Sequence, residues 1–157
     1  AGASGLALSP DGSTLYVSDL GSRCVWQVEA EGRELTAGGR NCTAFLAGLP
    51  GYPGALAMDP DGTLYVSYRW GRSSWLEKQA QSTLLRGIAL RAGQNLQEKL
   101  FRLAAEAPCA EAVDIATGSW QQTFTGLSQG SCAGVCPVDS KVYFGTADSR
   151  SLLAANR

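Results

Sequence analysis

The chain has 157 residues, of which 45% are hydrophobic, and 13 basic and 14 acidic side chains leave a formal net charge of −1. This near balance gives no basic stripe of the kind that nucleic-acid binders carry, and no apolar run approaches the roughly 20 residues that cross a bilayer. The composition therefore indicates a folded domain that neither binds nucleic acid nor spans a membrane.

Two stretches near the N-terminus are almost the same, Ser4 to Ser18 and Tyr52 to Ser67. Each has a short apolar run, a Pro-Asp-Gly turn and a second run of alternating side chains, which is typical of a β-hairpin. Asp11 and Asp61 are interpreted as turn residues rather than site residues. A weaker third copy runs from Ala133 to Gly145, so the chain is built from repeats.

Further strand-like segments follow the first hairpin. Residues 24–30 and 41–46 alternate as strands do, a polar, glycine-rich loop separates them, and the pattern restarts at Gly54. Four antiparallel strands that recur about every 40 to 50 residues fit propeller blades better than a sandwich, whose strands do not repeat one another's sequence. The fold class is predicted as all-β, with about three propeller blades.

The chain has five cysteines: Cys24, Cys42, Cys109, Cys132 and Cys136. The odd count leaves at least one unpaired. With no histidine and only one close pair, a zinc site is disfavoured, and small buried residues with room for one disulfide are the favoured interpretation. No metal and no cofactor are expected.

Asn41-Cys-Thr43 has the pattern of an N-glycosylation acceptor. Such a triplet also arises by chance. It favours the secretory pathway, in a vacuolar or extracellular protein.

Residues 73–107 break the strand pattern with apolar residues four apart, from Leu76 to Ala92, and Ser74 and Glu77 form a capping box. An amphipathic helical insert is predicted. Packing over the sheet end is favoured over resting on a membrane surface. Since it leaves from Tyr68-Arg-Trp70, on the rim where Ser4 and Gly54 begin their strands, the insert is expected to cap an axial small-molecule pocket.

The run Phe45-Leu-Ala-Gly-Leu-Pro-Gly-Tyr-Pro-Gly-Ala-Leu-Ala57, followed by a hairpin, the insert and Lys141-Val-Tyr-Phe-Gly-Thr146, resembles the C-terminal half of strictosidine synthase-like propellers. That group includes the plant alkaloid synthase and the adipocyte plasma membrane-associated proteins, and is more distantly similar to gluconolactonases and paraoxonases. The resemblance implies that residues 1–157 are one fragment, about three of six blades.

The family's catalytic groups find no match. Metal-binding relatives usually carry Asn-Gly where this chain has Ser4-Gly5, and Asp-Asn where it has Gly54-Ala55, so oxygen ligands are missing. The alkaloid synthase uses a glutamate near the start of the last repeat, whereas residues 131–138 hold no carboxylate. The resemblance therefore implies a lyase or hydrolase family but leaves open whether this chain is an enzyme.

A set of rim residues remains as candidates to contact a small apolar or aromatic molecule. They are Ser4, Asp19, Tyr52, Tyr68, Trp70 and Asp148, with Arg69 beside them. Asp19 and Asp148 fit strand-end caps of loop N–H groups better, and the aromatic residues fit packing between blades equally well.

Two functions stay open. One is a strictosidine synthase-like segment that helps form a lidded pocket; the other is a non-catalytic interaction module, with a lactonase or esterase-like hydrolase as a further alternative. Three blades leave bare strand edges. The remaining blades of a longer chain are the favoured neighbour, and a second copy is the alternative.

Overall fold

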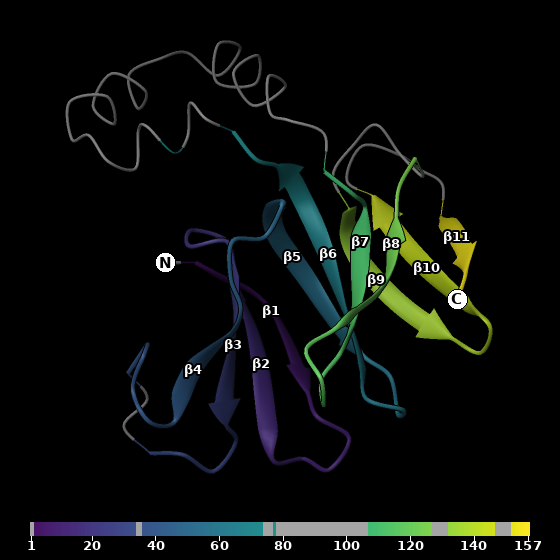
Figure 1. Ribbon diagram of the computed structural model, residues 1–157. Coiled ribbons are helices and arrows are strands. Elements are labelled where there is room, and N and C mark those ends of the chain that lie inside the picture. The colour runs from purple at the N-terminus through teal and green to yellow at the C-terminus, as the bar shows by residue number, and fades with distance from the viewer. Residues whose placement is uncertain (1, 34–35, 74–76, 78–106, 127–131, 147–151) are drawn as a thin grey trace.

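The computed structural model describes residues 2–33, 36–73, 77, 107–126, 132–146 and 152–157, and these fold into three antiparallel sheets (Figure 1). The first sheet has the order β1 (Ala3–Leu8), β2 (Thr14–Asp19), β3 (Cys24–Glu29) and β4 (Cys42–Leu46). The second has β5 (Gly51–Met58), β6 (Thr63–Gly71), β7 (Ala110–Asp114) and β8 (Trp120–Phe124). The third has β9 (Cys132–Val138), β10 (Lys141–Thr146) and β11 (Leu153–Asn156).

The all-β class and the propeller arrangement are confirmed. Each sheet is a meander of sequential neighbours, and the first strands β1, β5 and β9 lie together while the later strands fan outwards (Figure 1). Two details of the expectation are corrected. The second sheet starts at Gly51 rather than Gly54, and the third has three strands among the described residues rather than four.

The predicted helical insert, residues 73–107, lies almost entirely outside the described residues. Of it, the structure describes Ser73, Glu77 and Ala107. The backbone N–H of Glu77 donates to the carbonyl of Ser73. No helix among the residues described is long and apolar enough to span a membrane.

The turns of the hairpins follow the repeated sequence. Gly12 and Gly62 adopt φ of 74° and 87°, which suits the Pro-Asp-Gly turns, and Asp139 takes a φ of 51° in the third hairpin. Asp11 accepts a hydrogen bond from the N–H of Ser13, and Asp61 accepts one from the N–H of Thr63. Both aspartates hold their own turns, as the sequence predicts.

The core lies between sheets rather than within one sheet. Alternation along each strand gives every sheet two faces. One buried cluster fills the contact between the first and second sheets, and another fills the contact between the second and third. The first cluster includes Tyr16, Val25, Leu56, Leu64 and Val66. The second includes Tyr65, Phe124, Val142 and Phe144, and the rings of Phe124 and Phe144 lie 5.2 Å apart across the contact.

Two further links join the second and third sheets. A disulfide connects Cys109, just before β7, with Cys132 at the start of β9. At the opposite rim, the guanidinium of Arg157 forms ion pairs with Asp59 and Asp61 beside the β5–β6 turn. The second and third sheets are therefore linked to each other at both rims.

The inner strands β1 and β5 approach each other closely at Gly5. A Cβ atom added there would lie 2.8 Å from the backbone nitrogen of Leu56, and the backbone carbonyl of Gly54 is in the way as well. Backbone cannot move aside as a flexible side chain can. Glycine is thus required at this point by the packing of two sheets.

Replacing Gly5 with alanine is expected to lower the free energy of unfolding by about 1–3 kcal/mol, because the added methyl pushes β1 away from β5. Gly134→Ala is the matched control, since a Cβ at Gly134 on β9 meets nothing within 4 Å. Urea unfolding of both variants measures the difference. Equal stability of the two would contradict the close approach.

Candidate functional site

The candidate residues come from the starts of β1 and β5 and the ends of β2 and β6, which share one rim. Antiparallel register places Ala3 opposite Asp19, and Tyr52 opposite Trp70. The structure thus brings Ser4, Asp19, Tyr52, Tyr68 and Trp70 to the same end of the first two sheets. Asp148 lies outside the described residues.

Serine hydroxyls bind the two inner strands together at this rim. Ser4 Oγ donates to the carbonyl of Pro53 at 2.8 Å and lies 3.0 Å from Ser18 Oγ, and Ser18 Oγ, fully buried, donates to the carbonyl of Gly54 at 2.7 Å. Ser67, at the repeat position of Ser18, donates to the carbonyl of Ala55 at 3.0 Å. Sequence reasoning missed Ser18 and Ser67, although both repeats end in the same Tyr-Val-Ser.

Asp19 is buried and holds the loop that follows β2. Its carboxylate accepts hydrogen bonds from the N–H groups of Gly2 and Gly21 and from the hydroxyl of Ser22 at 2.6 Å. Burial disfavours the charged carboxylate and by itself would raise the pKa of Asp19. The hydrogen bonds have the larger effect and lower this pKa to about 2. A carboxylate with so low a pKa is a poor general acid or base near neutral pH.

Tyr52 is buried beside a group of charges. Burial raises the pKa of Tyr52, the Glu77 carboxylate raises it further, and a backbone hydrogen bond at Ser73 and the guanidinium groups of Arg23 and Arg72 oppose the shift. Glu77 pairs with Arg72 at 2.7 Å and with Arg23 at 3.1 Å.

Arg23 extends this charge group into the first sheet's loop. It adopts a φ of 51°, and its guanidinium donates to the carbonyl of Leu49 at 2.7 Å. This group ties the β2–β3 loop to the connection that precedes β5 and to the start of the insert. Arg23 and Glu77 were not found from the sequence, because nothing local marks a pair so far apart in the chain.

Tyr68 donates a hydrogen bond to the carboxylate of Glu111 on β7. Tyr68 is 2% exposed, and burial together with the hydrogen bond and charge of Glu111 raises its pKa. Both side chains lie on the face of the second sheet that packs against the first, since Val66 and Glu111 are directly opposite in register. Glu111 was also missed; its signal is a lone charge within the otherwise apolar Ala110–Val113.

Trp70 is half-buried at the end of β6, and the guanidinium of Arg69 lies 4.8 Å from the centre of its ring. Arg69 itself is exposed. Of the aromatic candidates, Trp70 is therefore the one with the most accessible surface, whereas Tyr52 and Tyr68 are covered.

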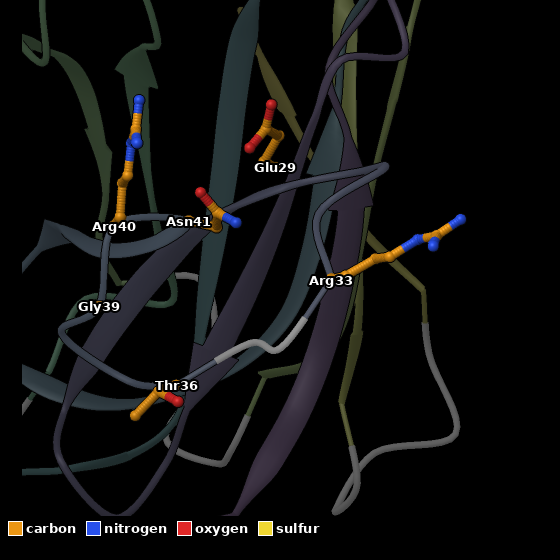
Figure 2. A pocket seen from close by; sticks show the side chains of 6 residues that line it. All are labelled: Glu29, Arg33, Thr36, Gly39, Arg40 and Asn41. Atoms are coloured by element: carbon orange, nitrogen blue, oxygen red, sulfur yellow. The ribbon is translucent and has the colours of Figure 1, made fainter.

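The structure also has a polar hollow of about 310 Å³ (Figure 2). It is formed by Glu29, Arg33, Thr36, Gly39, Arg40 and Asn41, in the β3–β4 connection. Because β3 starts at the rim where β2 ends, its last residue Glu29 lies at the opposite rim. The expected glycosylation residue Asn41 thus lines a polar surface at the opposite rim.

Within the parts of the chain that the structure describes, no group of three or more Cys, Asp, Glu or His side chains could hold a metal ion. The rim instead offers hydroxyls and the carboxylates of Asp19, Glu77 and Glu111, all of which already have protein partners.

Asp19 should make stability depend on pH. Its pKa is lowered on folding, so its stabilisation is present above about pH 4 and is lost as the pH falls toward 2, an effect of about 1–2 kcal/mol. Denaturant unfolding of Asp19→Asn and wild type should differ by this amount at pH 6 and converge near pH 2. Ser22→Ala should reproduce part of the loss, and an unchanged difference at every pH would refute this role of Asp19.

The comparisons with known proteins agree with the architecture. The family model described as SMP-30/Gluconolactonase/LRE-like region matches residues 1–97. Comparison with curated proteins gives no match.

Solved structures share the fold at low identity. A gluconolactonase from Xanthomonas campestris is 17% identical with a TM-score of 0.56, over 97% of this chain and 36% of that one. A luciferin-regenerating enzyme is 16% identical with a TM-score of 0.57, over 97% and 43%. The hydrazine synthase of Kuenenia stuttgartiensis is 19% identical with a TM-score of 0.55, over 99% and 32%.

The chain thus spans between 32% and 43% of the length of these structures. The family match covers more than half of the chain, and the strands that it includes form the first sheet and the inner hairpin of the second. The chain belongs to the SMP-30/gluconolactonase/LRE-like family of propeller proteins.

Proposed function

We propose that the chain is a non-catalytic sector of a small-molecule-binding propeller of this family. The observation that carries the proposal is the shared rim of β1, β2, β5 and β6, where the candidate carboxylate and hydroxyls already have protein partners and Trp70 keeps accessible surface. The expected ligand is a small apolar or aromatic molecule that contacts the rim at Trp70.

The rim charges support this role rather than catalysis. Asp19 is held fully ionised near neutral pH by its hydrogen bonds, and Glu77 is paired with two arginines. Neither group is placed to exchange a proton with a substrate. The closer likeness to strictosidine synthase-like propellers, carried by residues 45–57, and the role of residues 73–107 as a lid are parts of the same proposal.

The second candidate is a lactonase or esterase-like hydrolase, which the family match favours. A metal-dependent hydrolase that uses calcium needs six to eight oxygen ligands around the ion. It would therefore need further ligands from residues other than the described residues of the rim. A purely protein-binding module is the third candidate, and the same measurements separate all three.

Indole is a suitable probe of the rim. Saturation-transfer NMR should detect its binding to the intact chain, and Trp70→Ala should weaken the binding about three- to tenfold through loss of ring contact. Trp120→Ala, on the outer strand β8, is the control and should leave the affinity unchanged. Lactone hydrolysis that EDTA abolishes would favour the hydrolase, and no binding in either assay would favour the protein-binding module.

We further propose that the protein passes through the secretory pathway and carries a glycan on Asn41. The disulfide between Cys109 and Cys132 supports an oxidising compartment. Asn41 is partly exposed and Thr43 is exposed, so both can be reached from solvent.

Expression in a eukaryotic secretory host should give a species whose mass falls on treatment with a glycosidase that removes N-linked glycans. Asn41→Gln should abolish that shift, and Asn95→Gln, outside any acceptor triplet, should not. A secreted protein whose mass is unchanged by the glycosidase would rule out the modification.

A further inference from the structure

Strand β6 is irregular where it reaches the candidate rim. Trp70 of β6 is opposite Tyr52 of β5. The next pair in register is Tyr68 with Pro53, so Arg69, which lies between Tyr68 and Trp70, has no partner on β5. One extra residue on one strand of an antiparallel pair is a β-bulge. Pro53 has no backbone N–H to donate to the neighbouring strand, which accounts for the change of register at this point.

The bulge brings two consecutive side chains together. On a regular strand, consecutive side chains point to opposite faces of the sheet. Here the guanidinium carbon of Arg69 instead lies 4.8 Å from the centre of the Trp70 ring. Bulges change the direction in which a side chain points, and they are frequent beside functional sites. Arg69 and Trp70 therefore present a cation and an aromatic ring at the same place on the rim.

The charge of Arg69 has no carboxylate partner within the described part of the chain. The other two arginines of this rim, Arg23 and Arg72, share the carboxylate of Glu77 at 3.1 and 2.7 Å. Arg69 is exposed, and the contact of an exposed guanidinium with a ring is weak. Its guanidinium can therefore turn toward an anion that binds beside the ring.

The base of Arg69 lies near the inner strands of two neighbouring sheets. A Cβ atom added at Gly54 of β5 would lie 3.7 Å from the Cβ of Arg69 and 3.5 Å from the carbonyl oxygen of Cys132, at the start of β9. The side chain thus leaves the rim where the second and third sheets meet. Because the second sheet packs against a described sheet on each side, this position does not depend on what lies beyond the first and third sheets.

We propose that the rim ligand is an aromatic molecule with a carboxylate, whose ring contacts Trp70 and whose carboxylate pairs with the guanidinium of Arg69. The proposal rests on the proposed function and adds the charge of the ligand to it. A guanidinium has parallel N–H donors that match the two oxygens of a carboxylate, and such a pair is stronger than a hydrogen bond between neutral groups. An uncharged aromatic molecule would use Trp70 and leave the charge of Arg69 unpaired.

Indole-3-acetate and indole-3-acetamide are matched probes, because they share the indole ring and differ in the charge of the side group. In NMR titrations of the intact chain at pH 7, indole-3-acetate should bind about tenfold more tightly than the amide. Added salt should weaken binding of the acetate and leave binding of the amide unchanged, since only the acetate forms an ion pair.

Variants assign this preference to Arg69. Arg69→Gln should lower the affinity for the acetate about tenfold and leave the affinity for the amide within about twofold. Arg69→Lys keeps the charge without the planar fork and should retain part of the preference. Trp70→Ala should weaken binding of both probes alike. Arg33→Gln, an exposed arginine of the β3–β4 connection, is the matched control and should change neither affinity. Circular dichroism establishes that each variant is folded.

The outcomes separate this inference from the proposed function. Equal affinity of the wild-type chain for the two probes, or a preference for the acetate that Arg69→Gln leaves intact, would overturn the inference and leave the proposed function standing. If neither probe binds and indole does not bind either, both are wrong.

Discussion

The close approach of β1 and β5 is the constraint on which the rest of the structure depends. Gly5 leaves no room for a side chain against the backbone of the second sheet, and buried Ser18 fills the same junction with a hydrogen bond to the carbonyl of Gly54. Because the inner strands are held together here, the outer strands must diverge. That divergence lets each sheet bury one face on its neighbour, and large side chains such as Phe144 and Leu64 fill the space between them.

Much of this architecture could be predicted from the sequence, because the information is local. The Pro-Asp-Gly turns with glycines at positive φ specify the hairpins, and alternation along β2 and β6 specifies their faces. The repeat itself then indicates several sheets of one kind. The boundary at Gly51 was misplaced because Pro53 interrupts the strand pattern, although the strand continues through it with a shift of register.

What could not be predicted depends on contacts between residues distant in the chain. Five cysteines do not reveal that Cys109 pairs with Cys132, and the sequence around Tyr68 does not reveal that its hydroxyl meets Glu111. The sequence predicted Asp19 as a cap of loop N–H groups, yet its partners Gly2 and Ser22 could be known only from the loop geometry. These pairings decide whether a polar side chain at the rim is available to bind a ligand or exchange a proton. The site was therefore harder to predict than the fold.

Residues 72–109 connect β6 to β7 of the second sheet, and the positions of their two ends bear on how long this connection can be. The N–H of Tyr68 donates to the carbonyl of Cys109 at 2.9 Å, so the two ends of the connection are already side by side, and the disulfide fixes the returning end to β9. For a loop whose ends are fixed, each doubling of length costs only about 0.6 kcal/mol of closure entropy. Closure entropy therefore sets only a weak limit on the length of this connection, because its two ends are already held together by the sheet.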